Sequence, residues 1–453
     1  MKRLLRYVLL LSVVCFLAED ALAQTQTWKE MHKVTRKETI FGIAKDNGLT
    51  IEELIAANPD MNTPGYELKK GDYIFIPWPK GETPKTTNTV KQTVVPQHAT
   101  PAVSKTIHRI GVMLPLHDDN GDGKRMIEYY RGVLMAVDSL KQMGYNMEIH
   151  AWNTPENADM GKILEDPAAA QCELIIGPLY SNQVSELSRF VSRHGIKLLI
   201  PYSIIAPEVY SNSNIYQVYQ DQAMLNETCI DRFMEKFGND HVVLIDCNDE
   251  DSQKGVFTFG IRRQLENRNN PYSVVNLTTR EDMFAKAFSK TKNNVVVLNT
   301  GKSPQMLVAL EKLNGFRVLN PNVNITLWGY TEWLMYTKYQ LDNFYKYNTY
   351  VPSTFYYNPL SPQTVRFQQK YRWNFHQDMI ESLPRFAITG YDQAFYFIKG
   401  LIQQGKGYNG NTTGYQTIQS PLRFERAGNG GMMNRSTMLV HYRPDQTVEL
   451  LIK

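Results

Sequence analysis

Aromatic and acidic side chains gather between residues 328 and 347, and this combination suits a surface that binds flat or cyclic ligands. Trp328, Tyr330 and Trp333 flank Glu332, and more aromatic side chains follow at Tyr336, Tyr339, Phe344, Tyr345 and Tyr347. Aromatic faces beside polar groups stack on sugar rings, which predicts a cleft for a muropeptide or glycan fragment. The alternative is that these residues form the core and the ordinary apolar surface of a globular lobe.

A second segment has part of the spacing of a calcium-binding loop. Asp118, Asn120 and Asp122 are followed by Gly123 in a D-x-N-x-D-G pattern. A complete loop needs a bidentate Glu at its twelfth position, where this chain has Tyr129, with Glu128 one residue earlier. Acidic residues at the start of a helix are also ordinary capping groups. These three residues are therefore an incomplete candidate metal site, and no cofactor is expected.

Motifs of common enzymes are incomplete or missing in the sequence. Gly400 to Lys406 has part of the phosphate-loop spacing, but Gly407 stands where Ser or Thr is needed, and the segment is predicted to end a helix. The sequence has no G-x-S-x-G, H-E-x-x-H or zinc-spaced Cys/His set. Its 49 basic and 45 acidic residues give a formal charge of +4, in short basic runs that are not typical of nucleic-acid binding. We expect neither an enzyme nor a nucleic-acid-binding protein.

The N-terminus has the three parts of a secretory signal peptide. Lys2, Arg3 and Arg6 precede an apolar stretch from Val8 to Ala18, and Ala21-Leu-Ala23 fits a cleavage site. We expect residues 1–23 to be removed, together with Cys15, and the exported chain to begin at Gln24. No later segment has 18 consecutive apolar residues, so no transmembrane segment is expected in the mature chain.

Three cysteines remain after this cleavage, namely Cys172, Cys229 and Cys247. An odd number argues against a disulfide framework. Cys229 and Cys247 lie on neighbouring predicted elements, and oxidation is allowed in an exported protein. The alternative is three small, buried side chains.

Most of the chain alternates between predicted strands and helices. Residues 79–106 lack apolar periodicity and are rich in Thr, Pro, Lys and Gln, which predicts a linker. From residue 107 onward, short apolar strands alternate with amphipathic helices, a pattern typical of parallel α/β sheets. The predicted strands are 110–114, 147–152, 173–176, 196–201, 241–246, 272–277, 294–298 and 325–328, and the helices are 125–143, 181–194, 224–237, 255–267 and 304–313. Two such runs predict two Rossmann-like lobes.

The residues before the linker form a compact pattern of their own. Thr39 can cap one short helix, Thr50 and Glu53 form a capping box for another, and residues 73–76 are rich in β-forming side chains. Together with His32-Lys-Val34 and Leu68-Lys-Lys-Gly71-Asp, this block resembles the LysM domain, a βααβ module that binds N-acetylglucosamine polymers such as peptidoglycan. The resemblance covers residues 31–78 and departs from the family at Lys37, where Gly is usual. It implies a glycan site at Glu38, Thr39, Ile40, Phe41, Asn58, Pro59 and Asp60.

The larger region, residues 107–453, resembles a second family on a series of short motifs. These are Ile110-Gly-Val-Met-Leu-Pro-Leu116, Ile176-Gly-Pro178-Leu-Tyr-Ser181, Pro201-Tyr-Ser203, Ala206-Pro-Glu208, Gly390-Tyr-Asp392-Gln-Ala394 and Pro421-Leu-Arg-Phe424. In order and spacing they are similar to the type 1 periplasmic-binding fold of branched-chain amino-acid receptors. The resemblance implies lobe I near residues 107–219 and 350–415, lobe II near 220–349 and 416–453, and a ligand cleft closed by hinge motion.

The amino-acid clamp of that family is only partly matched. Ser181 matches the Ser that binds the ligand carboxylate at a helix start. Ile205 stands where a Thr is usual, in the segment that includes Ser203, and Glu332 is displaced by one position from the acid that pairs with the ligand ammonium. The ligand-binding residues implied are Ser181, Tyr180, Ser203, Ile205, Thr300, Trp328, Tyr330 and Glu332.

These expectations describe a bacterial envelope protein. The LysM resemblance predicts binding to peptidoglycan or another N-acetylglucosamine glycan, in the periplasm or at the cell wall. The two-lobed domain is expected to bind a small ligand, such as an amino acid, peptide or muropeptide, or an envelope protein. Two alternatives remain open: a solute-binding receptor of an amino-acid-type ABC transporter, and a regulator of a peptidoglycan synthase or hydrolase.

Overall fold

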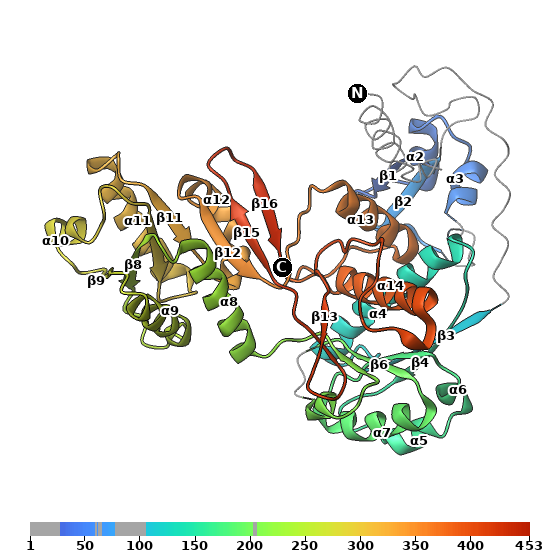
Figure 1. Ribbon diagram of the computed structural model, residues 1–453. Coiled ribbons are helices and arrows are strands. Elements are labelled where there is room, and N and C mark those ends of the chain that lie inside the picture. Colours follow the sequence, from blue (N-terminus) through green and yellow to red (C-terminus); the bar gives the residue numbers. More distant parts are fainter. Residues whose placement is uncertain (1–27, 59–60, 62–65, 78–105, 203–205) are drawn as a thin grey trace, which may run out of the picture. The chain divides into compact units, whose positions relative to one another are not determined.

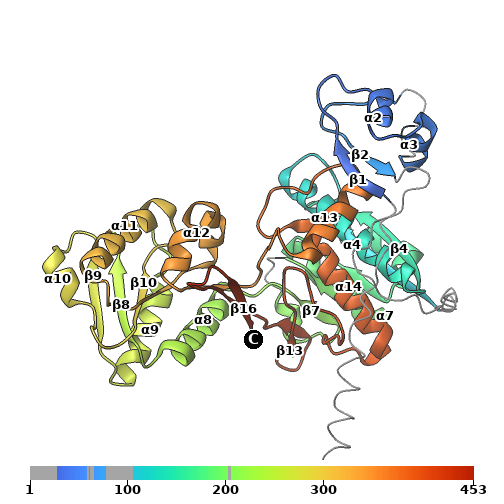
Figure 2. The ribbon, with the colours of Figure 1, turned by 90° about the horizontal axis from the view of Figure 1, so that it is seen from above.

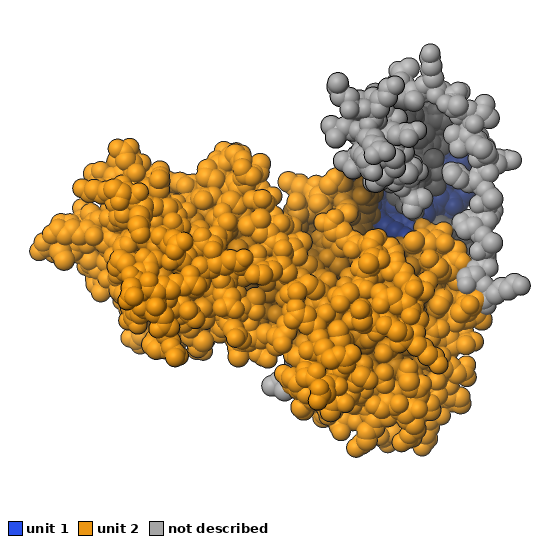
Figure 3. All heavy atoms as spheres, in the orientation of Figure 1, with its two compact units in different colours: residues 1–98, 368–378 blue, residues 99–367, 379–453 orange. Residues whose placement is uncertain are grey.

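The structure is a computed structural model that describes residues 28–58, 61, 66–77, 106–202 and 206–453. The expected signal peptide with Cys15, and nearly all of the expected linker, lie outside the described residues. The chain divides into two compact units (Figure 3): residues 1–98 with 368–378, and residues 99–367 with 379–453. No helix in the described ranges has the length and apolarity needed to cross a bilayer.

The smaller unit contains a two-stranded antiparallel sheet and two short helices. Its elements are β1 (Trp28–Lys33), α2 (Ile40–Asp46), α3 (Ile51–Ala57) and β2 (Tyr73–Pro77). The Thr39 side chain accepts a hydrogen bond from the Gly42 N–H, and Thr50 and Glu53 form the predicted capping box. A small apolar core holds the elements together: Val34, Ile43, Ala44, Leu49, Leu54, Met61, Ile74 and Ile76.

Residues 368–378 belong to the same unit through contacts with side chains of β2, where the Phe75 ring packs against Trp373 and Tyr73 makes polar contacts. The Tyr73 hydroxyl donates a hydrogen bond to Asp378 Oδ2 at 2.8 Å, and the Arg372 guanidinium lies 5.0 Å from the centre of the Tyr73 ring. Lys33 Nζ lies 4.9 Å from the centre of the same ring. These polar contacts are exposed, and such contacts contribute little to stability.

The larger unit contains two seven-stranded sheets, each with helices on both faces (Figures 1 and 2). In the first lobe the strand order is β13-β14-β7-β6-β5-β3-β4, parallel except for the β13–β14 pair. Its strands are β3 (Ile107–Leu114), β4 (Asn146–Asn153), β5 (Leu174–Ile176), β6 (Lys197–Ile200), β7 (Ile215–Gln217), β13 (Phe424–Arg426) and β14 (Met432–Asn434). Its helices are α4 (Gly121–Gln142), α5 (Met160–Leu164), α6 (Pro167–Ala170), α7 (Val184–His194) and α14 (Phe386–Gln404), with 3-10 turns η2 (Ser181–Gln183), η3 (Pro207–Tyr210) and η5 (Gly405–Gly407). Helix α13 (Pro362–Phe375) is divided between the units, and its residues from 368 onward belong to the smaller one.

In the second lobe the strand order is β16-β15-β12-β11-β10-β8-β9, and β15 and β16 are antiparallel to their neighbours. Its strands are β8 (His241–Asp246), β9 (Tyr272–Asn276), β10 (Asn294–Leu298), β11 (Ile325–Trp328), β12 (Thr349–Ser353), β15 (Met438–Tyr442) and β16 (Val448–Ile452). Its helices are α8 (Gln222–Phe237), α9 (Gly255–Asn267), α10 (Glu281–Lys286), α11 (Ser303–Leu319) and α12 (Thr337–Lys346), with the 3-10 turn η4 (Thr331–Tyr336). Helices α8 and α9 lie on one face of this sheet and α11 and α12 on the other (Figure 2).

The topology corrects the expected division of the lobes at two places. Residues 416–434 were expected in lobe II, but β14 pairs with β7, with Met432 opposite Tyr216. Residues 350–353 were expected in lobe I, but β12 pairs with β11 and β15 in the second sheet. The partners of β12 and β14 include strands that lie far from them in the sequence, and a local pattern does not specify such partners, so the sequence could not assign these strands to a sheet.

The first lobe is held together by a close helix crossing and a buried carboxylate. Helices α4 and α14 lie side by side (Figures 1 and 2), and a Cβ at Gly132 would lie 1.9 Å from the Ala387 carbonyl oxygen. The fully buried carboxylate of Asp392 on α14 accepts hydrogen bonds from the Tyr415 hydroxyl and the backbone N–H groups of Ile418, Gln419 and Ser420. Asp392 therefore fixes the segment that leads from α14 back to β13.

Candidate functional site

The expected glycan site lies in the smaller unit, where several of its residues have structural roles. Glu38 Oε2 accepts hydrogen bonds from the Thr35 backbone N–H at 2.6 Å and from His32 Nε2 at 2.8 Å, which lowers the pKa of this carboxyl. Asn58 is buried, and its side chain bonds to both backbone groups of Phe75 and to the Leu54 carbonyl oxygen. Glu38 and Asn58 therefore stabilise the turn and the sheet, whereas Pro59 and Asp60 lie outside the described residues.

The remaining expected residues lie at the start of α2. Thr39 caps this helix, Ile40 is half-buried beside the core, and the Phe41 side chain is 62 % exposed. Lys37, the residue that departs from the family pattern, has φ of 75°. A side chain in this left-handed region is disfavoured, which explains why Gly is usual at this position. The exposed Phe41 ring is the best placed of these groups to contact a sugar face.

In the first lobe, a cavity of about 400 Å³ lies against the carboxyl ends of the strands. Its lining includes Asp122, Arg125, Leu179, Tyr202, Phe386 and Gln393. Tyr180 and Ser181 are absent from the described lining residues, although the Tyr180 hydroxyl lies 3.4 Å from Asp122 Oδ2. Ser181 is exposed and begins a 3-10 turn, so the expected carboxylate site is not assembled around it. Ser203 and Ile205 lie outside the described residues.

The candidate calcium residues are engaged in capping and ion pairs. Asn120 Oδ1 accepts a hydrogen bond from the Gly123 N–H at the start of α4, and Asp122 pairs with Arg125 at 2.7 Å. Asp118 lies 3.7 Å from Lys124 Nζ. Within the described part of the chain, no three His, Cys, Asp or Glu side chains are grouped so that they could hold a metal ion. The capping interpretation of this motif therefore fits the structure.

Most of the aromatic cluster of the second lobe packs into the core, although Trp328 and Tyr330 also line a cavity. Trp328 and Trp333 are fully buried and Tyr330 is 6 % exposed. Trp328 stacks on Phe257 with ring centres 5.9 Å apart, and Trp333 stacks on Phe344 at 5.7 Å. Their faces are covered by other rings, so stacking on a sugar would require the core to open. Tyr339, in the same stretch of sequence, is in contrast 75 % exposed.

A second cavity, of about 650 Å³, lies at the carboxyl ends of β11 and β12. Glu332 lines it, but its Oε1 is 2.5 Å from Lys254 Nζ, which also lies 4.7 Å from the centre of the Tyr330 ring. Thr300 is fully buried, donates a hydrogen bond to Asp249 at 2.7 Å and is not among the residues that line this cavity. Burial raises the pKa of the Tyr330 hydroxyl well above its ordinary value.

The sequence prediction did not include Lys254, although a signal for it was present. Lys254 follows the predicted strand 241–246 and directly precedes the predicted helix 255–267. In α/β sheets, ligands bind where strands end and helices begin, so this position was a candidate. Arg232 on α8 also lines the cavity and gave no comparable signal. Cys172, Cys229 and Cys247 are free thiols in the structure.

Comparisons with known proteins agree with this architecture. Residues 32–77 match the model of the LysM domain. Residues covering 76 % of the chain align with all of a candidate branched-chain amino acid ABC transporter protein from Rhodospirillum rubrum, at 14 % identity and a TM-score of 0.52. Full-length LpoA from Haemophilus influenzae aligns at 13 % identity and a TM-score of 0.47, over 77 % of this chain and 60 % of that protein.

A third solved structure, LivJ from Streptococcus pneumoniae with isoleucine, aligns at 14 % identity and a TM-score of 0.38, over 77 % of this chain and 100 % of that one. No curated protein sequence gives a significant match. The similarity to the Rhodospirillum protein concerns the fold alone, because identity is low. Residues 32–77 are thus a LysM domain, and the larger unit has the fold of the type 1 periplasmic-binding proteins.

Proposed function

We propose that this chain is a non-enzymatic, extracytoplasmic protein that binds peptidoglycan through its LysM domain and a small ligand or a protein partner through its two-lobed domain. Both parts belong to binding types, and the described cavities hold no nucleophile with an adjacent general base. The LysM domain supplies attachment to the wall, and the cavities of the larger unit supply recognition.

The observation that carries this proposal is the exposed ring of Phe41. It lies in the first turn of α2, four residues after the left-handed Lys37, and 62 % of its surface is accessible. An exposed aromatic face is suited to stacking on an N-acetylglucosamine ring. The neighbouring Glu38 and Asn58 hold the surrounding turn and sheet in place, so the ring is presented by an ordered surface.

Co-sedimentation of the whole chain with purified peptidoglycan tests the proposal. We expect Phe41→Ala to weaken binding about tenfold, since an aromatic contact contributes about 1–1.5 kcal/mol. Phe259→Ala is the matched control, because Phe259 is 65 % exposed on α9 of the other unit. Wild-type protein that stays in the supernatant, or equal losses in the two variants, would contradict the proposal.

A transport receptor for free amino acids is the second candidate, and its support is the fold shared with the Rhodospirillum protein. The contacts of Glu332 weigh against it. The carboxylate expected to pair with a ligand ammonium is already paired with Lys254 at 2.5 Å. Calorimetric titration of the chain with leucine and isoleucine separates the candidates, since micromolar binding of either amino acid would favour the receptor.

A further inference from the structure

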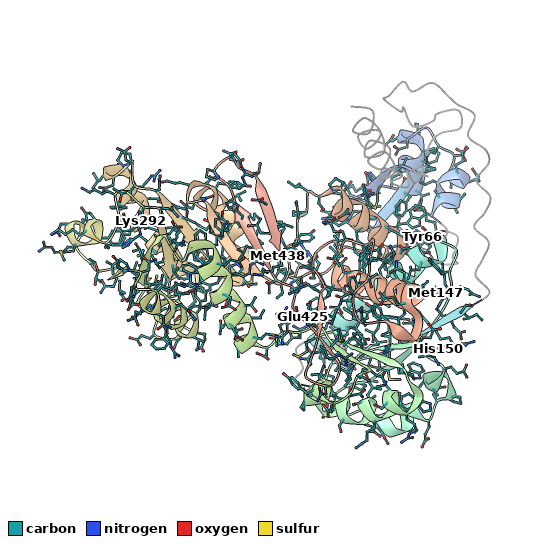
Figure 4. The ribbon with its side chains drawn as sticks, in the orientation of Figure 1. Tyr66, Met147, His150, Lys292, Glu425 and Met438 are labelled. Carbon is teal, nitrogen blue, oxygen red and sulfur yellow. The ribbon has the colours of Figure 1, made fainter. Side chains whose placement is uncertain are left out.

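The cavity of the second lobe is bordered by the N-terminus of one helix and the ends of two parallel strands. Residues from α8 and α9 form one side, and residues 328–335 and 352–355 form another. Thr437 and Met438 also line it, and Figure 4 labels Met438 on β15. Its volume of about 650 Å³ falls in the range of small-molecule sites, about 300–1,000 Å³.

The charges that line this cavity are two cations and one carboxylate: Arg232, Lys254 and Glu332. The Arg232 guanidinium donates to three neutral acceptors: the Leu451 carbonyl oxygen at 2.9 Å, the Thr437 carbonyl oxygen at 3.3 Å and the Thr437 hydroxyl oxygen at 3.4 Å. Among the described residues, no carboxylate oxygen lies within ion-pair distance of Arg232. Lys254 and Glu332 neutralise each other, so the side chains that line the cavity carry one positive charge in excess, on Arg232, which the carboxylate of Glu235 outside the lining partly offsets.

Helix α9 adds further donors on the same side. Lys254 is its N-cap residue, and no side chain caps this end of the 13-residue helix. The N–H groups of its first turn, from Gly255 to Phe257, have no acceptor within the helix. Trp328 also lines the cavity, and its buried Nε1 has no hydrogen-bond partner in the described structure. These donors and the helix dipole favour a negatively charged group.

The same cavity offers little to an ammonium group. Its one carboxylate, Glu332, accepts from Lys254 at 2.5 Å. A ligand ammonium would have to displace a lysine whose side chain is only 18 % exposed. Apolar contact is available instead, because Val256 and Met335 line the cavity and are 63 % and 55 % exposed.

We propose that this cavity binds a carboxylate attached to an apolar or peptide body, with no free ammonium beside it, such as the C-terminus of a short peptide. Lys254 exchanges Glu332 for the ligand carboxylate, and the first turn of α9 donates to the same anion. This inference rests on the proposed small-ligand role of the two-lobed domain and gives the chemistry of its ligand.

Calorimetric titration of the whole chain tests it with three probes: N-acetyl-alanyl-alanine, its C-terminal amide, and free alanine. We expect the acetylated acid to bind at least about tenfold more tightly than the other two, because a hydrogen bond to a charged group contributes a factor of that size. Equal affinity for the amide, tighter binding of free alanine, or no heat from the acid at millimolar concentration would overturn the inference.

Two variants give opposite expectations for the acetylated acid. Lys254→Gln removes the cation and should weaken binding about tenfold or more. Glu332→Gln removes the competing carboxylate and should tighten binding several-fold. Loss of binding in both variants would contradict the proposal that Lys254 exchanges Glu332 for the ligand carboxylate. Co-sedimentation with peptidoglycan should be unchanged in both, so failure here is distinguishable from failure of the LysM-based proposal.

Discussion

The crossing of α4 and α14 predicts a large effect from a single methyl group. At Gly390, an added Cβ would lie 2.0 Å from the Tyr129 carbonyl oxygen, and real Cβ atoms stay at least 3.0 Å from such atoms. In the Gly390→Ala variant the two helices must therefore separate locally by about 1 Å. The obstacle is backbone, which cannot rotate away as a flexible side chain would.

The cost can be estimated from the structure. Overpacking of a well-packed core costs about 1–3 kcal/mol, and a rigid obstacle places this site in the upper part of that range. Separation also strains the buried hydrogen bond from the Tyr129 hydroxyl to Gln393 Oε1, at 2.7 Å, which contributes about 1 kcal/mol. The higher helix propensity of Ala relative to Gly offsets at most about 1 kcal/mol of this loss. We expect a net loss of about 2–3 kcal/mol.

Scanning calorimetry of the whole chain measures this loss as a lower melting temperature. For a lobe of this size, about 2–3 kcal/mol corresponds to a decrease of roughly 4–12 °C. Gly315→Ala on α11 is the matched control, because a Cβ there meets nothing within 4 Å. This control should raise stability by about 0.5–1 kcal/mol. A melting temperature for Gly390→Ala at or above the wild-type value would refute the reasoning.

Three further predictions concern single side chains. Lys37→Gly should stabilise the LysM unit by about 0.5–1 kcal/mol, because Lys37 has φ of 75°, a backbone conformation that glycine adopts more readily than lysine. Urea unfolding followed by circular dichroism would measure this change in the free energy of unfolding. Burial raises the pKa of the Cys229 thiol to about 11, so at pH 8 its alkylation by iodoacetamide should be roughly 100-fold slower than that of an unhindered cysteine. Mass spectrometry of the labelled chain gives the rate of alkylation. A rate near that of free cysteine would contradict the expectation. Burial raises the pKa of Asp392 to about 6, so this group's contribution to stability is present below about pH 4 and is lost as the pH rises through 6. The stability advantage of wild type over Asp392→Asn should therefore shrink by up to about 3 kcal/mol between pH 4 and pH 7, and a difference that does not change with pH would argue against the assignment.

Central elements of the fold were predictable because their signals are local. Helix α9 and strands β10 and β11 occur at the predicted residues, since continuous apolar runs and helical periodicity define both ends. Strands β7 and β14 have three residues each, and such short segments have no period to detect. Their assignment depends on partners more than 200 residues apart, as for Tyr216 and Met432.

The candidate sites were less predictable than the fold, because one residue type can serve several purposes. Trp328 and Trp333 were expected at a ligand surface by their type and position; both are fully buried, and of the two Trp328 lines the second cavity. An aromatic residue after a strand can face either the core or the cavity, and only the packing of Phe257 and Phe344 decides between them. The position of Lys254, between a predicted strand and a predicted helix, marks it as a candidate, but many lysines occupy such positions and the sequence alone does not single this one out.

The two sheets of the larger unit have a consequence for how such a gene can change. Each lobe is assembled from separate stretches of the chain, with β13 and β14 returning to the first sheet before β15 and β16 complete the second. Neither lobe can therefore be copied, deleted or exchanged as one uninterrupted piece of coding sequence. The LysM module at residues 32–77 is continuous apart from its contacts with 368–378, so recombination can add or remove it in a single event. The two binding roles proposed for this chain can thus be inherited independently.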